Sequence, residues 1–331
     1  MSFEKSGPSF FSRKNRNAMF FFTVVFLIGA SARAGELLKL ELHRVLPVEG
    51  PKNNQPSGLC LYKGNLYTVS DKHDNRIFRI DPGEKSARMV PALTFSPPGK
   101  TYLDLEGVTC DERGNFYLAS EKTCRIIRVS QNAATAVFLT PDLKPTGRTK
   151  GLFKVGNAML EGITRAGPET FTLCAERQPR GILRVRLTKE GVRSDAFTCN
   201  RSRFMFPEKT SPDFSGLCMF RGRHYVLQRN ARLISELGIS KKGVREGEGW
   251  SYSHIVHRLS YRYAVIRYGM AEGLCMDDRF VYVILDNNNI PRLRYPKDRR
   301  PLLLIMKNPL AGKKDRGDAE KDSGKKGEAG E

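Results

Sequence analysis

The chain has 331 residues, of which 40% are hydrophobic, and a formal net charge of +21 at pH 7. This length and composition are enough for one large globular domain or two small ones. Residues 1–34 carry +4 and the last twenty residues are neutral overall, so the body between them keeps +17. That excess favours anionic partners, with a purely solubilising charge as the alternative. Nucleic acid is disfavoured, because no recognition-helix pattern is present.

Residues 1–34 have the features of an export signal or an N-terminal membrane anchor. A basic stretch at 13–16 precedes an apolar segment at 18–30, and Ala-Arg-Ala at 32–34 matches a small-residue cleavage pattern. Thirteen apolar residues are short for a bilayer crossing, which needs about 20. The sequence therefore predicts an exported protein, periplasmic or secreted, that is cleaved after residue 34. The alternative is an uncleaved anchor in the cytoplasmic membrane through 18–30, with the body outside.

Five similar units follow between residues 35 and 311. Each opens with Ser-Gly or Glu-Gly, and these dipeptides lie 49 to 57 residues apart. They are Ser57-Gly58, Glu106-Gly107, Glu161-Gly162, Ser215-Gly216 and Glu272-Gly273. After each dipeptide come an apolar run, a turn, an alternating run and a third run such as RIIRV at 125–129. Four short strands repeated about every 50 residues are typical of β-propeller blades.

The sequence thus predicts an all-β fold over 35–311, a five-bladed β-propeller of four-stranded antiparallel blades with almost no helix. Six blades are the alternative count. A β-sandwich is the alternative architecture, but it does not explain one dipeptide at five fixed offsets. The stretch 37–46 is expected to close the ring by pairing with 301–306. Residues 312–331 hold six basic and six acidic side chains and no large apolar residue, which predicts a disordered tail.

The repeated dipeptides predict an acidic cluster at one mouth of the propeller. In an antiparallel hairpin, the start of one strand lies beside the end of the next. The expected neighbours are Ser57 and Asp71, Glu106 and Glu121, Glu161 and Glu176, and Glu272 and Asp286. Glycine after the acid fits an axis where strands approach closely.

Glu106, Glu161 and Glu272 at this mouth, with Ser57 and Ser215 completing the ring, predict a hard-cation site. Calcium accepts six to eight oxygens in a flexible geometry, which carboxylates from separate blades can supply. Zinc is disfavoured, because neither His nor Cys converges there.

Two structural interpretations compete with the metal site. Each glutamate could bond backbone amides of the next blade, or pair with the arginines that open the third strands. Those arginines are Arg76, Arg125, Arg180, Arg232 and Arg292. For the outer acids Glu121 and Glu176, ion pairing is the favoured prediction.

The seven cysteines include no C-x-x-C motif, so a zinc knuckle or thioredoxin-type site is not predicted. Four of them are expected to be small buried hydrophobes on inner strands: Cys60, Cys110, Cys218 and Cys275. A disulfide among Cys124, Cys174 and Cys199 is an open alternative. His254 and His257 are predicted on a strand, facing opposite sides. His73, Asp74 and Asn287–Asn289 lie in predicted mouth loops as candidate ligand contacts.

The order of the dipeptides resembles that of the SdiA-regulated bacterial β-propellers and, more loosely, phytase-like and NHL-type propellers. The matching segments are DLEGVTC (104–110), AERQPRGILRV (175–185), DFSGLCM (213–219) and AEGLCMDD (271–278). The resemblance spans about residues 37–306. It implies an exported or anchored five-bladed propeller with bound calcium and no established activity. The positions of this chain that match the family pattern are the axial residues Glu106, Glu161 and Glu272. Asp71, Glu121 and Glu176 match around them.

The chain departs from that family pattern at Gln228-Arg229, where the family often has Ser-Asp, and in its basic body and charged tail. Two functions are predicted. The first is a non-catalytic, calcium-binding module of the cell envelope that binds an anionic small molecule, a polysaccharide or an envelope protein. The alternative is a metal-dependent hydrolase of a phosphoester or lactone, with an axial Glu as general base and Arg76 or Arg125 holding the anion. No G-x-S-x-G elbow surrounds Ser215, which argues against a serine esterase.

Overall fold

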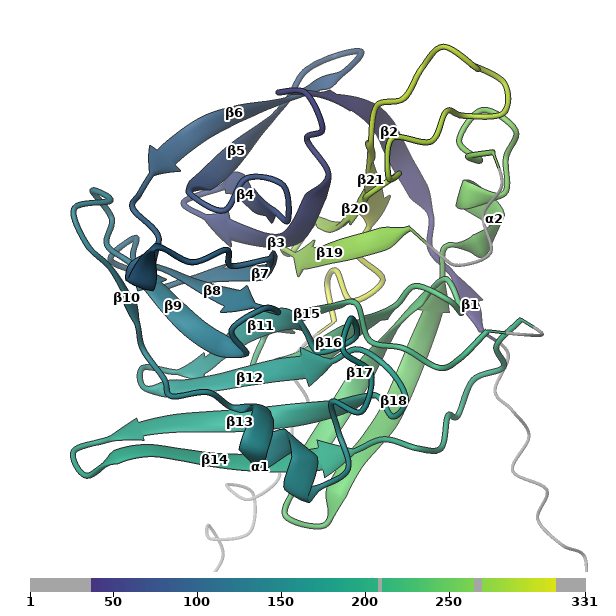
Figure 1. Ribbon diagram of the computed structural model, residues 1–331. Coiled ribbons are helices and arrows are strands. Elements are labelled where there is room, and N and C mark those ends of the chain that lie inside the picture. Colours follow the sequence, from purple (N-terminus) through teal and green to yellow (C-terminus); the bar gives the residue numbers. More distant parts are fainter. Residues whose placement is uncertain (1–36, 208–209, 265–269, 314–331) are drawn as a thin grey trace, which may run out of the picture. The chain divides into compact units, whose positions relative to one another are not determined.

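The computed structural model describes residues 37–207, 210–264 and 270–313 (Figure 1). It is an all-β structure, with 51% strand and 5% helix. The predicted export segment lies outside the described residues, as does the predicted tail beyond residue 313. Within the described ranges, no helix is long and apolar enough to span a bilayer.

The strands form sheets in which chain neighbours pair antiparallel. One four-stranded sheet contains β7 (Leu105–Cys110), β8 (Phe116–Ser120), β9 (Arg125–Val129) and β10 (Ala136–Phe138). Another contains β11 (Leu160–Gly167), β12 (Thr170–Ala175), β13 (Gly181–Thr188) and β14 (Gly191–Thr198). A five-stranded sheet contains β15 (Gly216–Phe220), β16 (Arg223–Gln228), β17 (Leu233–Ser240), β18 (Gly243–Ser251) and the parallel β1 (Leu38–Lys39).

The remaining sheet has eight strands in two halves. One half contains β3 (Pro56–Tyr62), β4 (Asn65–Ser70), β5 (Arg76–Pro82) and β6 (Ala87–Thr94). The other contains β19 (Ala271–Met276), β20 (Phe280–Leu285), β21 (Leu302–Lys307) and β2 (Leu42–Glu49). The halves join where β2 pairs with β6 in parallel, Val48 opposite Ala87. The prediction that an N-terminal strand pairs with residues 301–306 is confirmed, since β2 runs antiparallel to β21.

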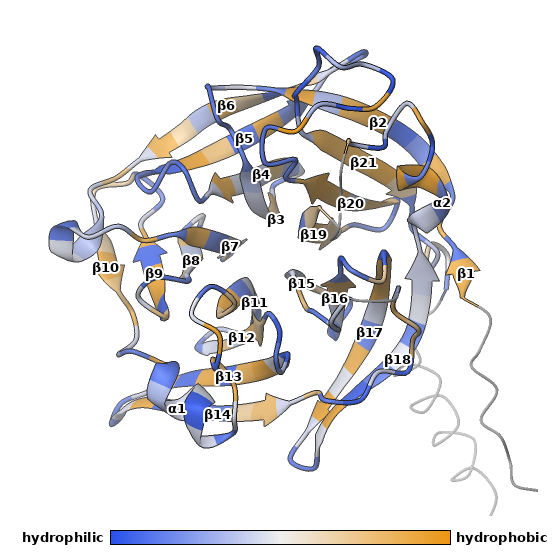
Figure 2. Cartoon of the chain, turned by 45° about the vertical axis from the view of Figure 1, so that its right-hand side comes forward, coloured by the Kyte–Doolittle hydropathy of each residue, from blue (hydrophilic) through white to orange (hydrophobic). Residues whose placement is uncertain are grey.

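The first strand of each unit lies nearest the centre (Figure 2). These inner strands contact one another in chain order, and β19 contacts β3 to close the ring. Glycine makes the approach feasible, because a Cβ on Gly107 would lie 2.8 Å from the carbonyl oxygen of Glu161. A Cβ on Gly273 would lie 2.5 Å from the carbonyl carbon of Gly58. The expectation that glycine is needed where the strands crowd the axis is confirmed.

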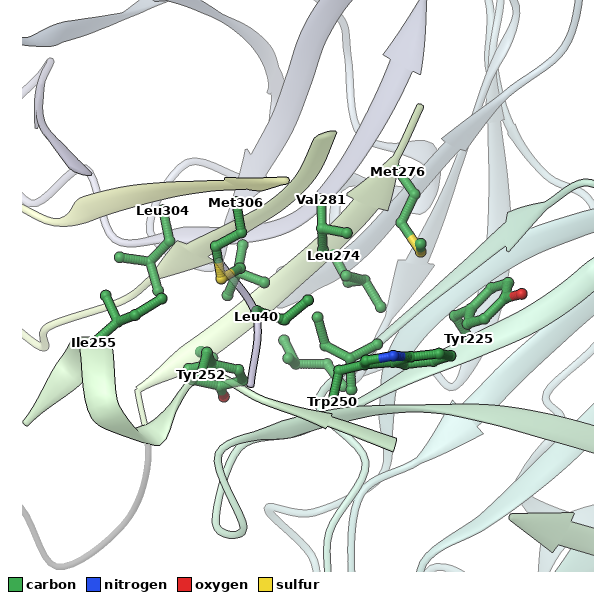
Figure 3. Packing of buried hydrophobic residues seen from close by; sticks show 14 of the residues in the cluster. Leu40, Tyr225, Trp250, Tyr252, Ile255, Leu274, Met276, Val281, Leu304 and Met306 are labelled. Carbon is green, nitrogen blue, oxygen red and sulfur yellow. The ribbon is translucent and has the colours of Figure 1, made fainter. Parts of the chain in front are cut away.

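Apolar side chains fill the spaces between neighbouring sheets. One core cluster joins the β15–β18 strands to β19–β21 and contains Trp250, which is 2% exposed, together with Tyr225 and Leu274 (Figure 3). Leu40, just after β1, packs into the same cluster. This burial fixes how each sheet meets its neighbour, and so fixes where the inner-strand ends converge.

Short helices interrupt the strands: η1 (Pro98–Lys100), α1 (Lys144–Thr149) and α2 (Ser253–Val256). The prediction of a strand carrying His254 and His257 is wrong, because His254 lies within α2 and His257 follows it. The segment leaves the sheet after β18, and Ile255 packs into the core from a helical turn. The apolar residues of this segment therefore follow the spacing of a helix and not the two-residue alternation of a strand.

Candidate cation site at the inner-strand starts

A cavity of about 510 Å³ lies where the inner strands begin and the second strands end. The predicted neighbours meet there, because Pro56 pairs with Ser70 and Leu105 with Ser120, directly before Asp71 and Glu121. Among the described residues, its lining includes eight carboxylates and three basic side chains. The carboxylates belong to Asp71, Asp104, Glu106, Glu121, Glu161, Glu176, Glu272 and Asp286. The basic residues are Lys72, Arg177 and Arg229.

Three inner strands deliver their glutamates through β-bulges. The strand register shifts between Leu105 and Gly107, between Leu160 and Gly162, and between Ala271 and Gly273. The residue inside each shift is one of Glu106, Glu161 and Glu272. A bulged residue leaves the hydrogen-bonded ladder, which re-aims its side chain, and here all three reach the cavity. The Glu-Gly dipeptide therefore combines an acid at a bulge with a glycine at a close strand contact.

The carboxylates gather into two groups, each with three oxygens within 4.8 Å of one another. One group is Asp71, Asp104 and Glu106, and the other is Glu121, Glu161 and Glu176. The three predicted axial glutamates therefore do not share one group: Glu106 is in the first group, Glu161 is in the second and Glu272 is in neither. Their joint role as metal ligands stays a prediction.

Asp104 is a site residue that the sequence interpretation missed. Its backbone has φ 56°, in the left-handed region that aspartate tolerates better than most residues. The Asp74 carboxylate accepts hydrogen bonds from the amides of Leu103 at 2.6 Å and Asp104 at 3.0 Å, which holds this turn in place. Asp104 stands two residues before Glu106 in the segment DLEG. Its side chain reaches the cavity because of the backbone turn at this position, which the sequence alone does not reveal.

Arg229 crosses the acidic cavity from the end of β16. Its guanidinium contacts the carboxylates of Glu272 and Glu176, and its Nε donates to Asp213 Oδ2 at 3.1 Å. Arg177 also contacts Glu176. Burial lowers the pKa of Arg229, but the nearby carboxylates raise this pKa by more than burial lowers it, so the side chain stays charged. The Gln228-Arg229 departure therefore places a cation of the chain itself among the acids.

The remaining carboxylates are held in an unfavourable electrostatic environment. Burial, followed by the charges of Glu161 and Glu272, raises the pKa of Glu106 well above its usual range. Burial likewise raises the pKa of Asp286 to about 7, although the Asn288 amide opposes the shift. Carboxylates this close cannot all ionise without a compensating cation. Oδ1 of Asp71 and Oε2 of Glu272 are buried without hydrogen-bond partners, so the donor set suits a hard cation.

The other predicted residues either line the cavity or bond backbone groups around it. Ser215 Oγ donates to the Ala271 carbonyl at 2.7 Å. Ser57 lines the cavity wall. Glu121 accepts a bond from the Met159 amide at 2.8 Å, which ties two sheets together. The Asn287 side chain donates to Ile290 and Arg299 carbonyls, whereas Asn288 lines the cavity.

The arginines at the starts of the third strands do not pair with the mouth acids in the described structure. Arg180 binds Glu246 at 2.7 Å and Gln228 at 2.6 Å, and Arg292 contacts Asp298. Arg125 lies over the Phe138 ring, and neither it nor Arg76 lines the cavity. His73 packs edge-on against Phe78. All seven cysteines lie among the described residues and are free thiols, so the open disulfide alternative is not seen.

One family model matches part of the chain, and solved structures resemble it. The family model described as "Phytase-like: Esterase-like activity of phytase" matches residues 56–181, less than half of the chain. The solved glutaminyl cyclase of Myxococcus xanthus is similar with a TM-score of 0.52 and 10% identity, covering 82% of this chain and 98% of that one. A virginiamycin B lyase from Staphylococcus aureus has a TM-score of 0.41 and 10% identity, covering 80% and 98%. No curated protein sequence matches the chain.

At 10% identity, the structural similarity to the cyclase shows the fold alone. Membership of the SdiA-regulated family stays a prediction.

Proposed function

We propose that the chain is an exported five-bladed β-propeller that binds Ca²⁺ in the acidic cavity and, with it, an anionic ligand, as a non-catalytic module of the cell envelope. The eight-stranded sheet then counts as two blades. The observation that carries the proposal is the set of eight carboxylates facing three basic side chains around one cavity of about 510 Å³. The body of the protein is strongly basic, yet eight carboxylates gather around this one cavity. Such a local excess of negative charge favours a bound cation there.

The Asp71, Asp104 and Glu106 group is the favoured position for the ion. In the other group, Glu176 already contacts Arg229 and Arg177, and Glu121 accepts a backbone hydrogen bond. Lys72 contacts only Oδ2 of Asp71, and Oδ1 stays unpartnered. Glu106 would thus be the principal ligand, while Glu161 and Glu272 share the charge of Arg229.

A neighbouring basic cavity supports an anionic ligand. It has a volume of about 860 Å³, and the loop that supplies Asn288 to the acidic cavity supplies Asn287 and Asn289 to this one. Its basic lining residues are Lys52, Arg294, Lys297, Arg299 and Arg300. A ligand carrying phosphate or carboxylate groups could contact the Ca²⁺ with one group and these side chains with another.

A metal-dependent phosphoesterase is the second candidate. Asp286 lines the acidic cavity, and its pKa of about 7 matches a group that exchanges a proton near neutral pH. The matching family description names an esterase-like activity, which is a property of that family. In this alternative, Lys72 and Arg229 would face the substrate anion, since they line the cavity and Arg76 and Arg125 do not.

Calorimetric titration and thermal melting with Ca²⁺ or a chelator test the proposal. At a Ca²⁺ concentration about 100 times Kd, binding stabilises the folded state by about 2.7 kcal/mol. The melting temperature should rise by roughly 5 °C or more. Glu106→Gln should lose the heat of binding and the shift, whereas Glu84→Gln, which alters an exposed carboxylate in a turn, should keep both.

A screen with p-nitrophenyl phosphate and a simple lactone separates the two candidates. Ca²⁺ binding without turnover supports the binding module. Turnover that is lost in an Asp286→Asn variant that still binds Ca²⁺ supports the esterase. Absence of Ca²⁺ binding by the wild-type chain contradicts both candidates.

A further inference from the structure

A second cavity lies at the opposite ends of the inner strands, and sulfur atoms line it. Its volume is about 340 Å³, and it is bordered by residues that follow the repeat glycines. Its sulfur-bearing residues are Cys60, Cys110, Cys218, Met219, Cys275 and Met276. The ring of close glycine contacts lies between this cavity and the acidic one along each inner strand. The two cavities therefore differ in donor chemistry, oxygen at one end and sulfur at the other.

Three of the thiols occupy one position in the repeat. Cys60, Cys218 and Cys275 each stand two residues after the repeat glycine. Cys110 stands one residue later in its own unit, at the last position of β7, and is only partly buried. Strand pairing and ring closure thus bring together thiols that are 50 to 215 residues apart in the chain.

Cys60 and Cys110 come from neighbouring inner strands, β3 and β7, which contact each other. Both thiols line the cavity, and the Cys110 thiol donates to the carbonyl of Leu61, the residue next to Cys60, at 3.3 Å. Cys275 lines the same cavity from β19, the inner strand that contacts β3. The guanidinium of Arg165 also lines this cavity, where it pairs with the Glu112 carboxylate at 3.1 Å.

The sequence interpretation of these cysteines as small buried hydrophobes is confirmed for Cys60, Cys218 and Cys275, each of which is buried in an apolar cluster. Cys110 is only partly buried: it packs against the same apolar cluster as Cys60, but it also lines the cavity together with Cys60 and Arg165. Two adjacent thiols with a cation nearby are a donor set for a soft metal ion.

We propose that Cys60 and Cys110 bind one soft monovalent metal ion, Cu⁺ or Ag⁺, with Cys275 as a further thiol of the same cavity. The ion displaces one proton from each of the two thiols to solvent. Two sulfur–metal bonds replace two S–H bonds, and no oxidation state changes. Arg165, which also pairs with Glu112, is a cation at the cavity wall that can offset part of the negative charge of the resulting bis-thiolate complex.

A structural Zn²⁺ site does not fit this cavity. Zinc requires four converging ligands in a tetrahedral arrangement. Within the described ranges, sets of three or more His, Cys, Asp or Glu ligand atoms within 4.8 Å of one another occur only among the mouth acids. Cu⁺ and Ag⁺ are satisfied by two thiolates, which matches the Cys60–Cys110 pair.

Anaerobic titration of the full-length, reduced chain with Cu⁺ in the presence of bicinchoninate tests the proposal. We expect one equivalent of Cu⁺ to be withdrawn from the chelator, with thiolate-to-copper charge-transfer absorption. The Cys60→Ser/Cys110→Ser double variant should lose this equivalent. Cys199→Ser should retain it, because the Cys199 thiol lies outside the cavity and bonds the Arg201 carbonyl, a bond that serine can keep.

A second measurement uses only the wild-type chain and so does not depend on whether the double variant folds. Iodoacetamide labelling mapped by mass spectrometry should modify Cys110, the partly buried thiol, and one equivalent of Ag⁺ should protect it. Failure of the wild-type chain to withdraw Cu⁺ overturns the proposal. So does unchanged Cu⁺ binding in a folded double variant, or Cys110 labelling that Ag⁺ does not reduce.

Discussion

Replacing Arg229 with Gln removes a guanidinium that contacts Glu272, Glu176 and Asp213 together. The Arg229 side chain is 14% exposed, and the three carboxylates are 11%, 1% and 0% exposed. Removing one partner of a buried ion pair costs about 3–5 kcal/mol, because the remaining charge is left uncompensated. Arg177 still contacts Glu176, and the acids can take up protons, so we expect the lower end, about 3 kcal/mol at pH 7.5.

Urea denaturation followed by fluorescence measures this loss, since the single tryptophan, Trp250, is buried in the core. Arg79→Gln is the matched control: it breaks an exposed pair with Asp81 at 2.6 Å, and exposed pairs contribute little. Burial raises the pKa of Glu272 and raises that of Asp213 to about 8, so these two acids can take up protons at pH 5 and the Arg229→Gln deficit should shrink there. Ca²⁺ should reduce the deficit at pH 7.5. An Arg229→Gln variant as stable as Arg79→Gln would refute the counter-ion assignment.

Two further predictions concern the axis and its acids. Gly107→Ala should destabilise the fold by about 1–3 kcal/mol in the same denaturation assay, because the added Cβ meets Glu161 O at 2.8 Å. Gly156→Ala, with nothing within 4 Å, should have almost no effect, and equal losses would contradict the crowded axis. Without Ca²⁺, stability should fall as pH rises from 4 to 7, since folded Asp286 holds its proton to about pH 7 and an unfolded aspartate loses it near 3.8. Melting temperatures that rise over this range, or a fall that Ca²⁺ leaves unchanged, would contradict this account.

The repeat made much of the fold predictable from the sequence. The spacing of the Ser-Gly and Glu-Gly dipeptides indicated strands that open at a common axis, and the observed inner strands begin at or next to those dipeptides. The need for glycine followed from crowding, and the contacts of Gly107 and Gly273 bear it out. These features depend on short segments that recur along the chain, so they can be recognised in one sequence.

The arrangement of charges within the mouth was not predictable in the same way. Arg229 was visible only as a departure from a pattern, because its reach to Glu272 and Glu176 depends on where the closed ring places distant strands. Asp104 depends on a left-handed turn that Asp74 stabilises from another unit. That Cys60 and Cys110 line one cavity likewise depends on the contact between the inner strands β3 and β7, which no local sequence motif predicts.

The central claim is that a cation occupies the acidic cavity, and anomalous diffraction tests it most directly. Crystals of the chain grown with Ca²⁺, and others soaked in Tb³⁺ as a calcium substitute, would locate the ion. We predict an anomalous peak bound by the carboxylates of Asp71, Asp104 and Glu106, and its loss in Glu106→Gln. A cavity without an anomalous peak in crystals grown with excess Ca²⁺, and filled only by protein and water, would contradict the claim.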